Sequence, residues 1–181
     1  MWTAKFQFDG SDLLYGKTAK KFNAEVRGFS LNVYHQEDKN KEYVTSVGRF
    51  INPNADFKEV IDFVKKDPRL VNIEEHNGFF IITVIEDEDF YYFTSPNFVH
   101  ISPVIISPKG MYTFHLASWK REELEKLIKK VEDFPKFKLL SLKEETITNV
   151  SISGLQPGFT EKQKQAYELA VKKGYYEYPK K

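Results

Sequence analysis

The chain has 181 residues, a formal net charge of +1 at neutral pH, 41% hydrophobic and 29% charged residues, and no cysteine. This length suits one domain, or one domain with part of another, and the composition argues against wholesale disorder. The lack of cysteine excludes disulfide bonds, thiolate nucleophiles and cysteine-ligated zinc. The aromatic content, 16 Phe and 10 Tyr, favours a β-rich core first and an aromatic-lined ligand pocket second.

Neither terminus nor interior shows a membrane signal. Residues 1–6 lack the apolar run of a signal peptide, and the longest apolar stretch, 79–85, is too short to cross a bilayer. We therefore expect a cytoplasmic protein with no membrane partner.

From Ser153 onward, the sequence has six lysines and three glutamates, which gives this segment a charge of +3 and the remainder a charge of −2. Such a distribution is consistent with a sensor that carries a DNA-binding module at its end.

Alternation of apolar and polar residues predicts the strands of the first half of the chain. They cover residues 2–8, 29–33, 43–51, 70–75 and 79–85. The polar segment 36–41 separates two of them as a hairpin loop, and Asn77-Gly78 is a strong signal for a second hairpin.

Two helices are predicted between these strands. The first covers 13–22, with Ser11 or Asp12 as its cap. The second has an apolar stripe at helical spacing, formed by Phe57, Val60, Ile61 and Val64. Asp56 and Glu59 form its cap pair, and Asp67-Pro68 ends it. The resulting order of strand, helix, strand, strand, helix, strand is that of a ferredoxin-like fold.

The second half of the chain contains a similar unit. Short strands are predicted over 90–93 and 99–106, then a strand at 111–116, a helix capped by Ser118 and a strand at 137–142. The stripe of this helix is Leu124, Leu127, Ile128 and Val131. Each of these four residues lies the same number of positions after its counterpart in the earlier helix, that is, after Phe57, Val60, Ile61 and Val64. Pro135 lies that same number of positions after Pro68. This regularity predicts an internal repeat. We expect an α+β body of ferredoxin-like strand-helix-strand units with a mostly antiparallel sheet, whose halves pack face to face or join into one sheet.

A domain boundary is predicted in the turn-rich segment 154–158, so that residues 1–152 form the body and 153–181 begin another domain. Thr160 and Gln163 have the spacing of a capping box at a helix start. Lys172 and Lys173 precede Gly174, as is typical of a helix end. Small alanines on one side of this helix would let another helix approach closely.

This segment resembles the archaeal regulators with a bacterio-opsin-activator-type helix-turn-helix domain. The resemblance rests, in this order and spacing, on Phe159-Thr160-Glu161-Lys162-Gln163, Ala166, Leu169-Ala170, Gly174-Tyr175-Tyr176 and Pro179-Lys180. It implies the first helix of a DNA-binding domain whose recognition helix would lie downstream, so that only the start of the domain is expected before Lys181.

The resemblance also implies roles for particular residues. Packing between the helices of that domain would involve Ala166, Leu169, Ala170, Tyr175 and Tyr176. Candidates for contacts with the phosphates of double-stranded DNA are Lys162, Lys164, Lys172 and Lys173. In such regulators, the symmetry of a homodimer sets the spacing of the half-sites.

Signatures of catalysis are weak. Gly16-Lys17-Thr18 resembles the end of a phosphate-binding loop, but Ser11 stands where that loop needs glycine. The histidines, at 35, 76, 100 and 115, have no ligand spacing, and no nucleophile elbow is present. The acidic run 86–89 is typical of a solvated turn. We therefore expect no enzyme activity, no cofactor and no metal site.

The sequence thus predicts a DNA-binding transcriptional regulator whose body senses a small-molecule effector or forms a homodimer. The alternative is a small-molecule-binding regulatory module with no role in DNA binding. In that case aromatic residues from the region 79–98 would line the ligand pocket.

Overall fold

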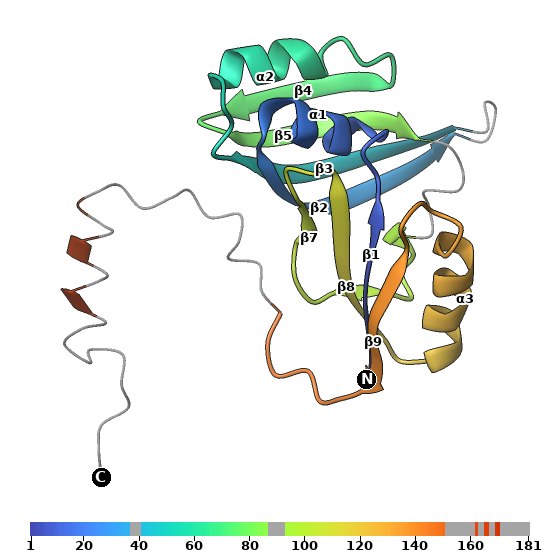
Figure 1. The fold of residues 1–181 in the computed structure, drawn as a ribbon. Coiled ribbons are helices and arrows are strands. Elements are labelled where there is room, and N and C mark those ends of the chain that lie inside the picture. Colours follow the sequence, from blue (N-terminus) through green and yellow to red (C-terminus); the bar gives the residue numbers. More distant parts are fainter. Residues whose placement is uncertain (37–40, 87–92, 151–161, 163–164, 167–168, 171–181) are drawn as a thin grey trace.

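A computed structural model of the protein describes residues 1–36, 41–86, 93–150, 162, 165–166 and 169–170. Within these residues the body is α+β, with three helices on a nine-stranded sheet (Figure 1). The elements are β1 (Trp2–Asp9), α1 (Leu14–Phe22), β2 (Glu25–Gln36), β3 (Lys41–Ile51), α2 (Phe57–Val64), β4 (Leu70–His76), β5 (Phe79–Glu86), β6 (Val99–His100), β7 (Val104–Ile106), β8 (Met111–Ser118), α3 (Arg121–Val131) and β9 (Lys138–Glu144).

The sheet is continuous and its neighbouring strands are antiparallel. Its order is β4-β5-β3-β2-β7-β8-β1-β9, with β6 pairing beside β8. The pairing of β2 with β7 joins the first half of the sheet to the second. Of the two arrangements that the internal repeat allowed, the joined sheet is therefore confirmed and face-to-face packing of separate sheets is wrong.

The repeat is visible in the topology of the two ends of the sheet. In the first half, α2 connects β3 to β4, and β5 lies between those two strands. In the second half, α3 connects β8 to β9, and β1 lies between them. Read from either edge, the order is therefore the same, and β2 and β7 meet at the centre. This agrees with the constant offset between the apolar stripes of α2 and α3.

The position of β1 differs from the sequence-based expectation. A ferredoxin-like sheet made from the first six elements in chain order would place β1 beside strands of the first half. Instead β1 pairs with β8 and β9, which lie far away in the chain. The fully buried Phe6 and Phe8 explain this choice, because they stack with Phe114 of β8 at ring-centroid distances of 5.3 and 5.7 Å.

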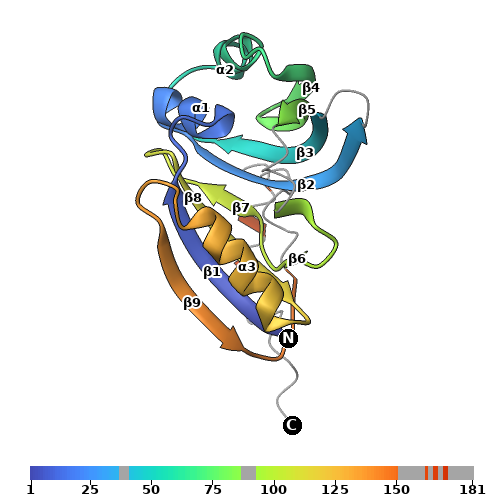
Figure 2. The ribbon, with the colours of Figure 1, turned by 90° about the vertical axis from the view of Figure 1, so that its right-hand side faces the viewer.

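The helices cover the two halves separately (Figure 2). In that view α1 and α2 lie over the first half of the sheet, and α3 lies against β1 and β8. The predicted apolar stripes are buried beneath them: Val60, Ile61 and Val64 on α2, and Leu124, Leu127 and Val131 on α3. One hydrophobic core therefore extends through both halves.

The cap of α2 is confirmed, whereas the other two predicted caps are wrong. Asp56 Oδ1 accepts a hydrogen bond from the backbone N–H of Glu59 at 2.9 Å. At α1 neither Ser11 nor Asp12 caps the helix, because the N–H of Gly16 in the first turn is instead bound by the Tyr112 hydroxyl of β8. At α3 the predicted cap Ser118 is the last residue of β8, two residues before the cap position.

One predicted turn is confirmed, and one predicted strand is not. Asn77 and Gly78 have φ values of 51° and 82°, which confirms the tight hairpin between β4 and β5. The strand predicted over 90–93 lies mostly outside the described residues, and its last residue, Phe93, is in a 3₁₀ turn.

Asp9 fastens the end of β1 to the turn that follows α3. Its Oδ2 lies 2.8 Å from Lys136 Nζ, and its Oδ1 accepts from the Ser11 N–H at 3.0 Å. The hydrogen bond from Lys136, and then that from Ser11, lower the pKa of Asp9 from 3.8 to about 2. The folded state therefore gains stability from ionised Asp9 above pH of about 4 and loses it as the pH falls towards 2.

We expect Asp9→Asn to lower the free energy of unfolding near pH 7. The difference in this free energy between wild type and variant should decrease as the pH falls from about 4 to about 2, because wild-type Asp9 becomes protonated over this range. Urea denaturation at several pH values measures this, with the exposed Asp62→Asn as the control. An effect of Asp9→Asn that stays constant across this range would contradict the assignment.

Candidate functional site

The candidate site lies where the two halves of the sheet separate. β2 pairs with β7 only through Val26, Arg27 and Gly28, although it continues beside β3 as far as Gln36. Beyond Gly28 the hydrogen-bonded ribbon of β2 and β3 therefore leaves β7 and β8. A cavity opens at this separation and is lined by residues of both halves.

The cavity has a volume of about 60 Å³. A water molecule needs about 10–15 Å³, so this space admits several waters or part of a small organic molecule. Its walls are mostly apolar, with Phe and Tyr side chains from five parts of the chain, namely Tyr15, Phe29, Phe80, Phe93, Tyr112 and Phe114. A mostly apolar lining with a few polar groups is typical of small-molecule sites.

A wider cleft of about 400 Å³ adjoins the cavity. It runs between the 30–33 stretch of β2 and the segment 93–100. Ser30, Phe93 and His100 line both the cavity and the cleft, so the two spaces meet at these residues. A ligand can therefore occupy the inner cavity and extend into the cleft.

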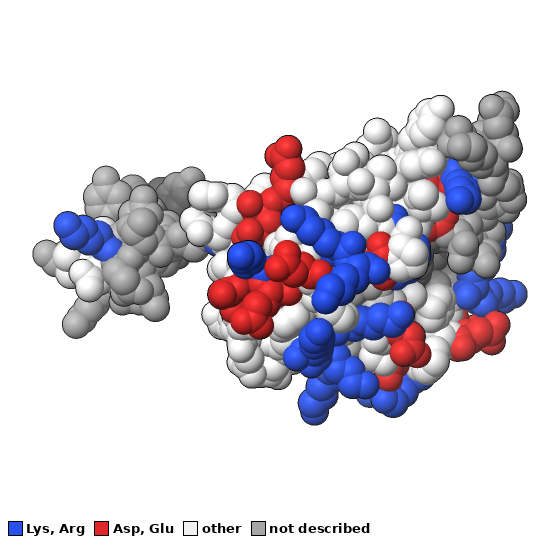
Figure 3. Space-filling view, turned by 90° about the horizontal axis from the view of Figure 1, so that it is seen from above, with Lys and Arg blue, Asp and Glu red and all other residues white. Residues whose placement is uncertain are grey.

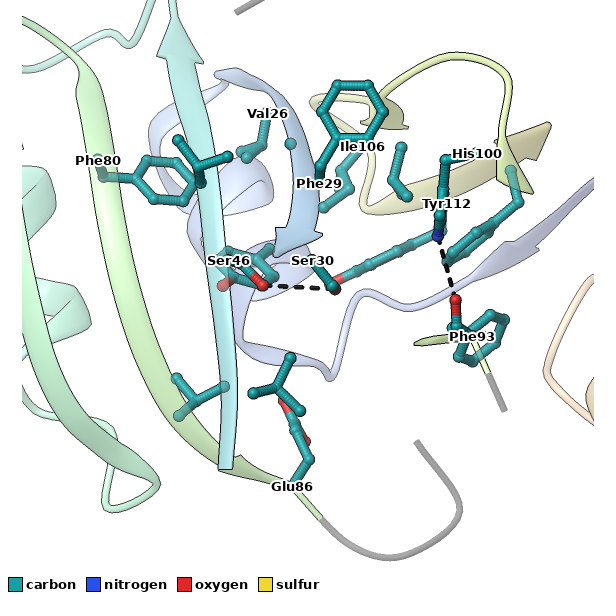
Figure 4. Close-up of a pocket in the computed structure, with 17 residues that line it drawn as sticks. Val26, Phe29, Ser30, Ser46, Phe80, Glu86, Phe93, His100, Ile106 and Tyr112 are labelled. Carbon is teal, nitrogen blue, oxygen red and sulfur yellow. Dashed lines mark hydrogen bonds between the residues drawn. The ribbon is translucent and has the colours of Figure 1, made fainter. Parts of the chain in front are cut away.

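Several neutral polar groups line the inner cavity. Ser30 Oγ and Ser46 Oγ, on neighbouring strands, are 3.5 Å apart. Figure 4 shows this pair between Phe80 on one side and Tyr112 and His100 on the other. The hydroxyl of Tyr15, whose ring stacks with Phe80 at 5.9 Å, is buried close to Ser46, but neither Ser46 nor another described residue meets it with the geometry of a full hydrogen bond.

His100 presents a second buried polar atom without a partner. Its Nε2 lies 3.1 Å from the carbonyl oxygen of Phe93 and must donate, because a carbonyl only accepts. In the neutral ring, Nδ1 is then an acceptor, and it is buried without a partner in the described part of the chain. Burial lowers the pKa of His100, although the bond to Phe93 opposes this, so the ring is neutral at neutral pH.

The remaining ionisable groups in the described lining are the phenols of Tyr15 and Tyr112 and the carboxylate of Glu86. Burial raises the pKa of Tyr15, partly offset by the nearby Ser46, and burial likewise raises the pKa of Tyr112. Both phenols are therefore neutral. Glu86 is the one acidic residue in the described lining, and it forms an ion pair with Arg69 at 3.4 Å. Such a site favours neutral groups over charged ones.

The residues singled out for DNA binding are only partly described. Lys162 has helical backbone and is exposed, as is Ala166, while Leu169 is 53% exposed and Ala170 partly so. The other candidates lie outside the described residues, namely Lys164, Lys172, Lys173, Tyr175 and Tyr176. Packing of these residues within a helix-turn-helix domain thus stays a prediction.

The aromatic region named from the sequence contributes to the cavity, with Phe80 and Phe93 in its walls and Phe98 in the adjoining cleft. The polar residues Tyr15, Ser46 and His100 were not identified. The sequence did contain a signal for Ser46, because buried and partly exposed residues alternate along β3 and Ser46 lies at a buried position between Val44 and Phe50. For Tyr15 and His100 no local pattern distinguishes them.

The resemblance to a phosphate-binding loop does not extend to the structure. Gly16, Lys17 and Thr18 lie inside α1 rather than in a loop before it. The buried Thr18 hydroxyl donates to the Leu14 carbonyl at 2.8 Å, so it is not directed at a phosphate or metal ion. No cluster of three or more potential metal ligands occurs among the residues described.

The helices of the described chain are all too short or too polar to span a bilayer. Comparison of the chain with protein-family models, with curated proteins and with solved structures finds no match. The cavity and its surroundings are therefore the basis for assigning a function.

Proposed function

We propose that the body, residues 1–152, is a small-molecule-binding regulatory module whose ligand occupies the cavity between the two halves of the sheet. The observation that carries this proposal is the pair of buried, unpartnered polar atoms, Tyr15 Oη and His100 Nδ1, at an otherwise apolar cavity. A buried polar atom without a partner costs about 1–3 kcal/mol. A ligand that supplies the missing hydrogen bonds would recover that free energy.

The position of the cavity suits regulation. Its walls belong to both halves, which are joined only through the short pairing of β2 with β7. A ligand that contacts both walls would stabilise one relative arrangement of the halves.

We further propose that each half is a ferredoxin-like unit. In the first half, the spatial order β2-β3-β5-β4 is that of a ferredoxin-like sheet. β2 occupies the place of the fourth strand of such a sheet, although it comes before the other three strands in the chain.

The proposal is tested by thermal unfolding in the presence of a library of metabolites. A ligand at about 100 times its Kd should stabilise the protein by about 2.7 kcal/mol, which raises Tm by roughly 5–10 °C for a domain of this size. The variant Ser46→Leu, which fills the cavity, should lose this increase. The matched control is Thr45→Leu, because Thr45 directly precedes Ser46 in β3 and does not line the cavity.

Should Ser46→Leu fail to fold, Ser30→Leu at the junction of cavity and cleft provides a second variant. Equal stabilisation of wild type and both cavity variants by the same ligand would place its binding elsewhere. A library without any stabilising compound would argue against a ligand-binding function.

The second candidate function is a DNA-binding transcriptional regulator, with double-stranded DNA bound by the C-terminal domain that begins near residue 153. Support comes from the resemblance to the helix-turn-helix regulators and from the exposure of Lys162 and Ala166. The body itself offers little for DNA on the face over α1 and α2. There Lys and Arg side chains alternate with Asp and Glu (Figure 3), and this mixture has no single sign of charge.

Binding of labelled double-stranded DNA, followed by anisotropy at several salt concentrations, tests this candidate. If Lys162 contacts a phosphate, Lys162→Ala should reduce the slope of log K against log salt by about 0.9. Lys58→Ala on the exposed side of α2 is the control and should leave the slope unchanged. Equal slopes for both variants would remove Lys162 from the DNA contact.

A further inference from the structure

We propose that the ligand of this cavity is an uncharged molecule with a planar ring and one polar end that both donates and accepts a hydrogen bond, such as a primary amide or an alcohol. This inference rests on the proposed ligand-binding function and specifies its ligand class. It follows from the charge, the shape and the hydrogen-bonding capacity of the lining.

The charge of the lining excludes ionised ligands. The described lining contains no Lys or Arg, and the nearby Arg69 is held by Asp67 at 3.0 Å and by Glu86 at 3.4 Å, so a carboxylate in the cavity would have no free cation among these residues. An ammonium group would have to compete for Glu86 with the guanidinium of Arg69, which Asp67 holds in place. Burying an uncompensated charge costs several kcal/mol, so neutral molecules bind preferentially.

The shape of the lining favours a flat ring. The Phe93 and Phe114 rings are stacked, with centroids 4.6 Å apart and planes inclined by 21°. Tyr15 and Phe80 form a similar pair inclined by 18°. Aromatic rings stack favourably with another ring in offset or tilted arrangements of this kind.

The hydrogen-bonding capacity sets the polar end. His100 Nδ1 can only accept, because Nε2 carries the ring proton towards Phe93, so the ligand must supply an O–H or N–H there. The Tyr15 hydroxyl can donate to a ligand oxygen, and the Ser30 and Ser46 hydroxyls can do either. An amide or alcohol supplies both a donor and an acceptor, whereas an ether or a ketone supplies only an acceptor.

The inner cavity, at about 60 Å³, is smaller than the roughly 150 Å³ that holds benzene in a protein core, so a ring enters it only in part and otherwise occupies the adjoining cleft of about 400 Å³. The inner cavity admits only a small apolar group, and its connection to the cleft passes Ser30 and His100. The polar end therefore lies at this junction, and substituents beyond it extend into the cleft. Figure 4 shows Ser30 and His100 among the residues that line the inner cavity.

The test uses four probes of similar shape, benzamide, toluene, benzoate and benzylammonium, with affinities measured by calorimetry on the full chain at pH 7.5. We expect benzamide to bind about thirtyfold more tightly than toluene, the factor that corresponds to two hydrogen bonds of about 1 kcal/mol each. Benzoate and benzylammonium should bind at least about a hundredfold more weakly than benzamide.

The variant Tyr15→Phe keeps the ring and removes the unpartnered hydroxyl, so the fold should be retained. It should weaken benzamide binding about fivefold and leave toluene binding unchanged. Tyr34→Phe, at an exposed position of β2 outside the lining, is the matched control. Binding of benzoate or benzylammonium as tightly as benzamide would overturn the inference but leave the proposed function intact.

Absence of binding by all four probes would also contradict this ligand class. If the metabolite library then contained a stabilising compound of another class, only this inference would fail. If it contained none, the proposed function would fail as well.

Discussion

Replacing Phe8 with alanine should lower the free energy of unfolding by about 3–5 kcal/mol, the usual loss for a buried phenylalanine. Phe8 is fully buried in β1, and its ring centroid lies 4.5 Å from Phe134, 5.5 Å from Tyr112 and 5.7 Å from Phe114. One side chain thus connects β1 to β8 and to the turn after α3. Its removal would leave a cavity among rigid rings that cannot easily collapse.

Urea denaturation followed by circular dichroism measures this loss. Phe63→Ala is the control of the same chemistry at a partly buried position on α2 and should cost clearly less. A loss below about 1 kcal/mol for Phe8→Ala would contradict the packing of β1 between β8 and β9.

Gly16→Ala should also destabilise the fold, by about 2 kcal/mol, even though alanine favours a helix over glycine by about 1 kcal/mol. A Cβ at Gly16 would clash with the carbonyl oxygen of Gly10. That carbonyl cannot retreat freely. It accepts a hydrogen bond from the Leu13 N–H at 2.9 Å, and the Gly10 N–H is bound to the Gly110 oxygen at 3.0 Å.

The same substitution should affect the cavity. The Gly16 N–H donates to the Tyr112 hydroxyl at 3.2 Å, and both Tyr15 and Tyr112 line the cavity. We expect Gly16→Ala to weaken ligand binding as well as stability. Lys17→Ala, at the next and exposed position of α1, should change the free energy of unfolding by less than about 0.5 kcal/mol. A Gly16→Ala protein as stable as wild type would show that α1 does not approach Gly10 this closely.

The parts of the fold that were predictable are those with local signals. The apolar stripe and Asp56 cap identified α2, and Asn77-Gly78 identified the hairpin between β4 and β5. The strand partner of β1 was not predictable, because alternation shows that a strand is half-buried without showing which strand covers it. The missing cap of α1 has the same origin, since Tyr112 supplies it from a distant strand.

The candidate site was predictable only through its apolar part. The aromatic residues of 79–98 indicated a pocket, and two of them line the cavity. The polar atoms that define the ligand come from α1, β3 and β6, which the chain brings together only when β2 and β7 join the halves. The constant offset between the two helix stripes indicated that two halves exist but not that their junction opens beyond Gly28.

The most direct test of the ligand site is a map of backbone amide shifts by ¹H–¹⁵N NMR, recorded as benzamide is added to the full chain. We predict that the largest changes occur at the junction of the two halves, at Gly28, Ser30, Ser46 and His100. We also predict little change on the exposed side of α2. Changes confined to surface positions away from the cavity, or no saturable change at all, would contradict the account.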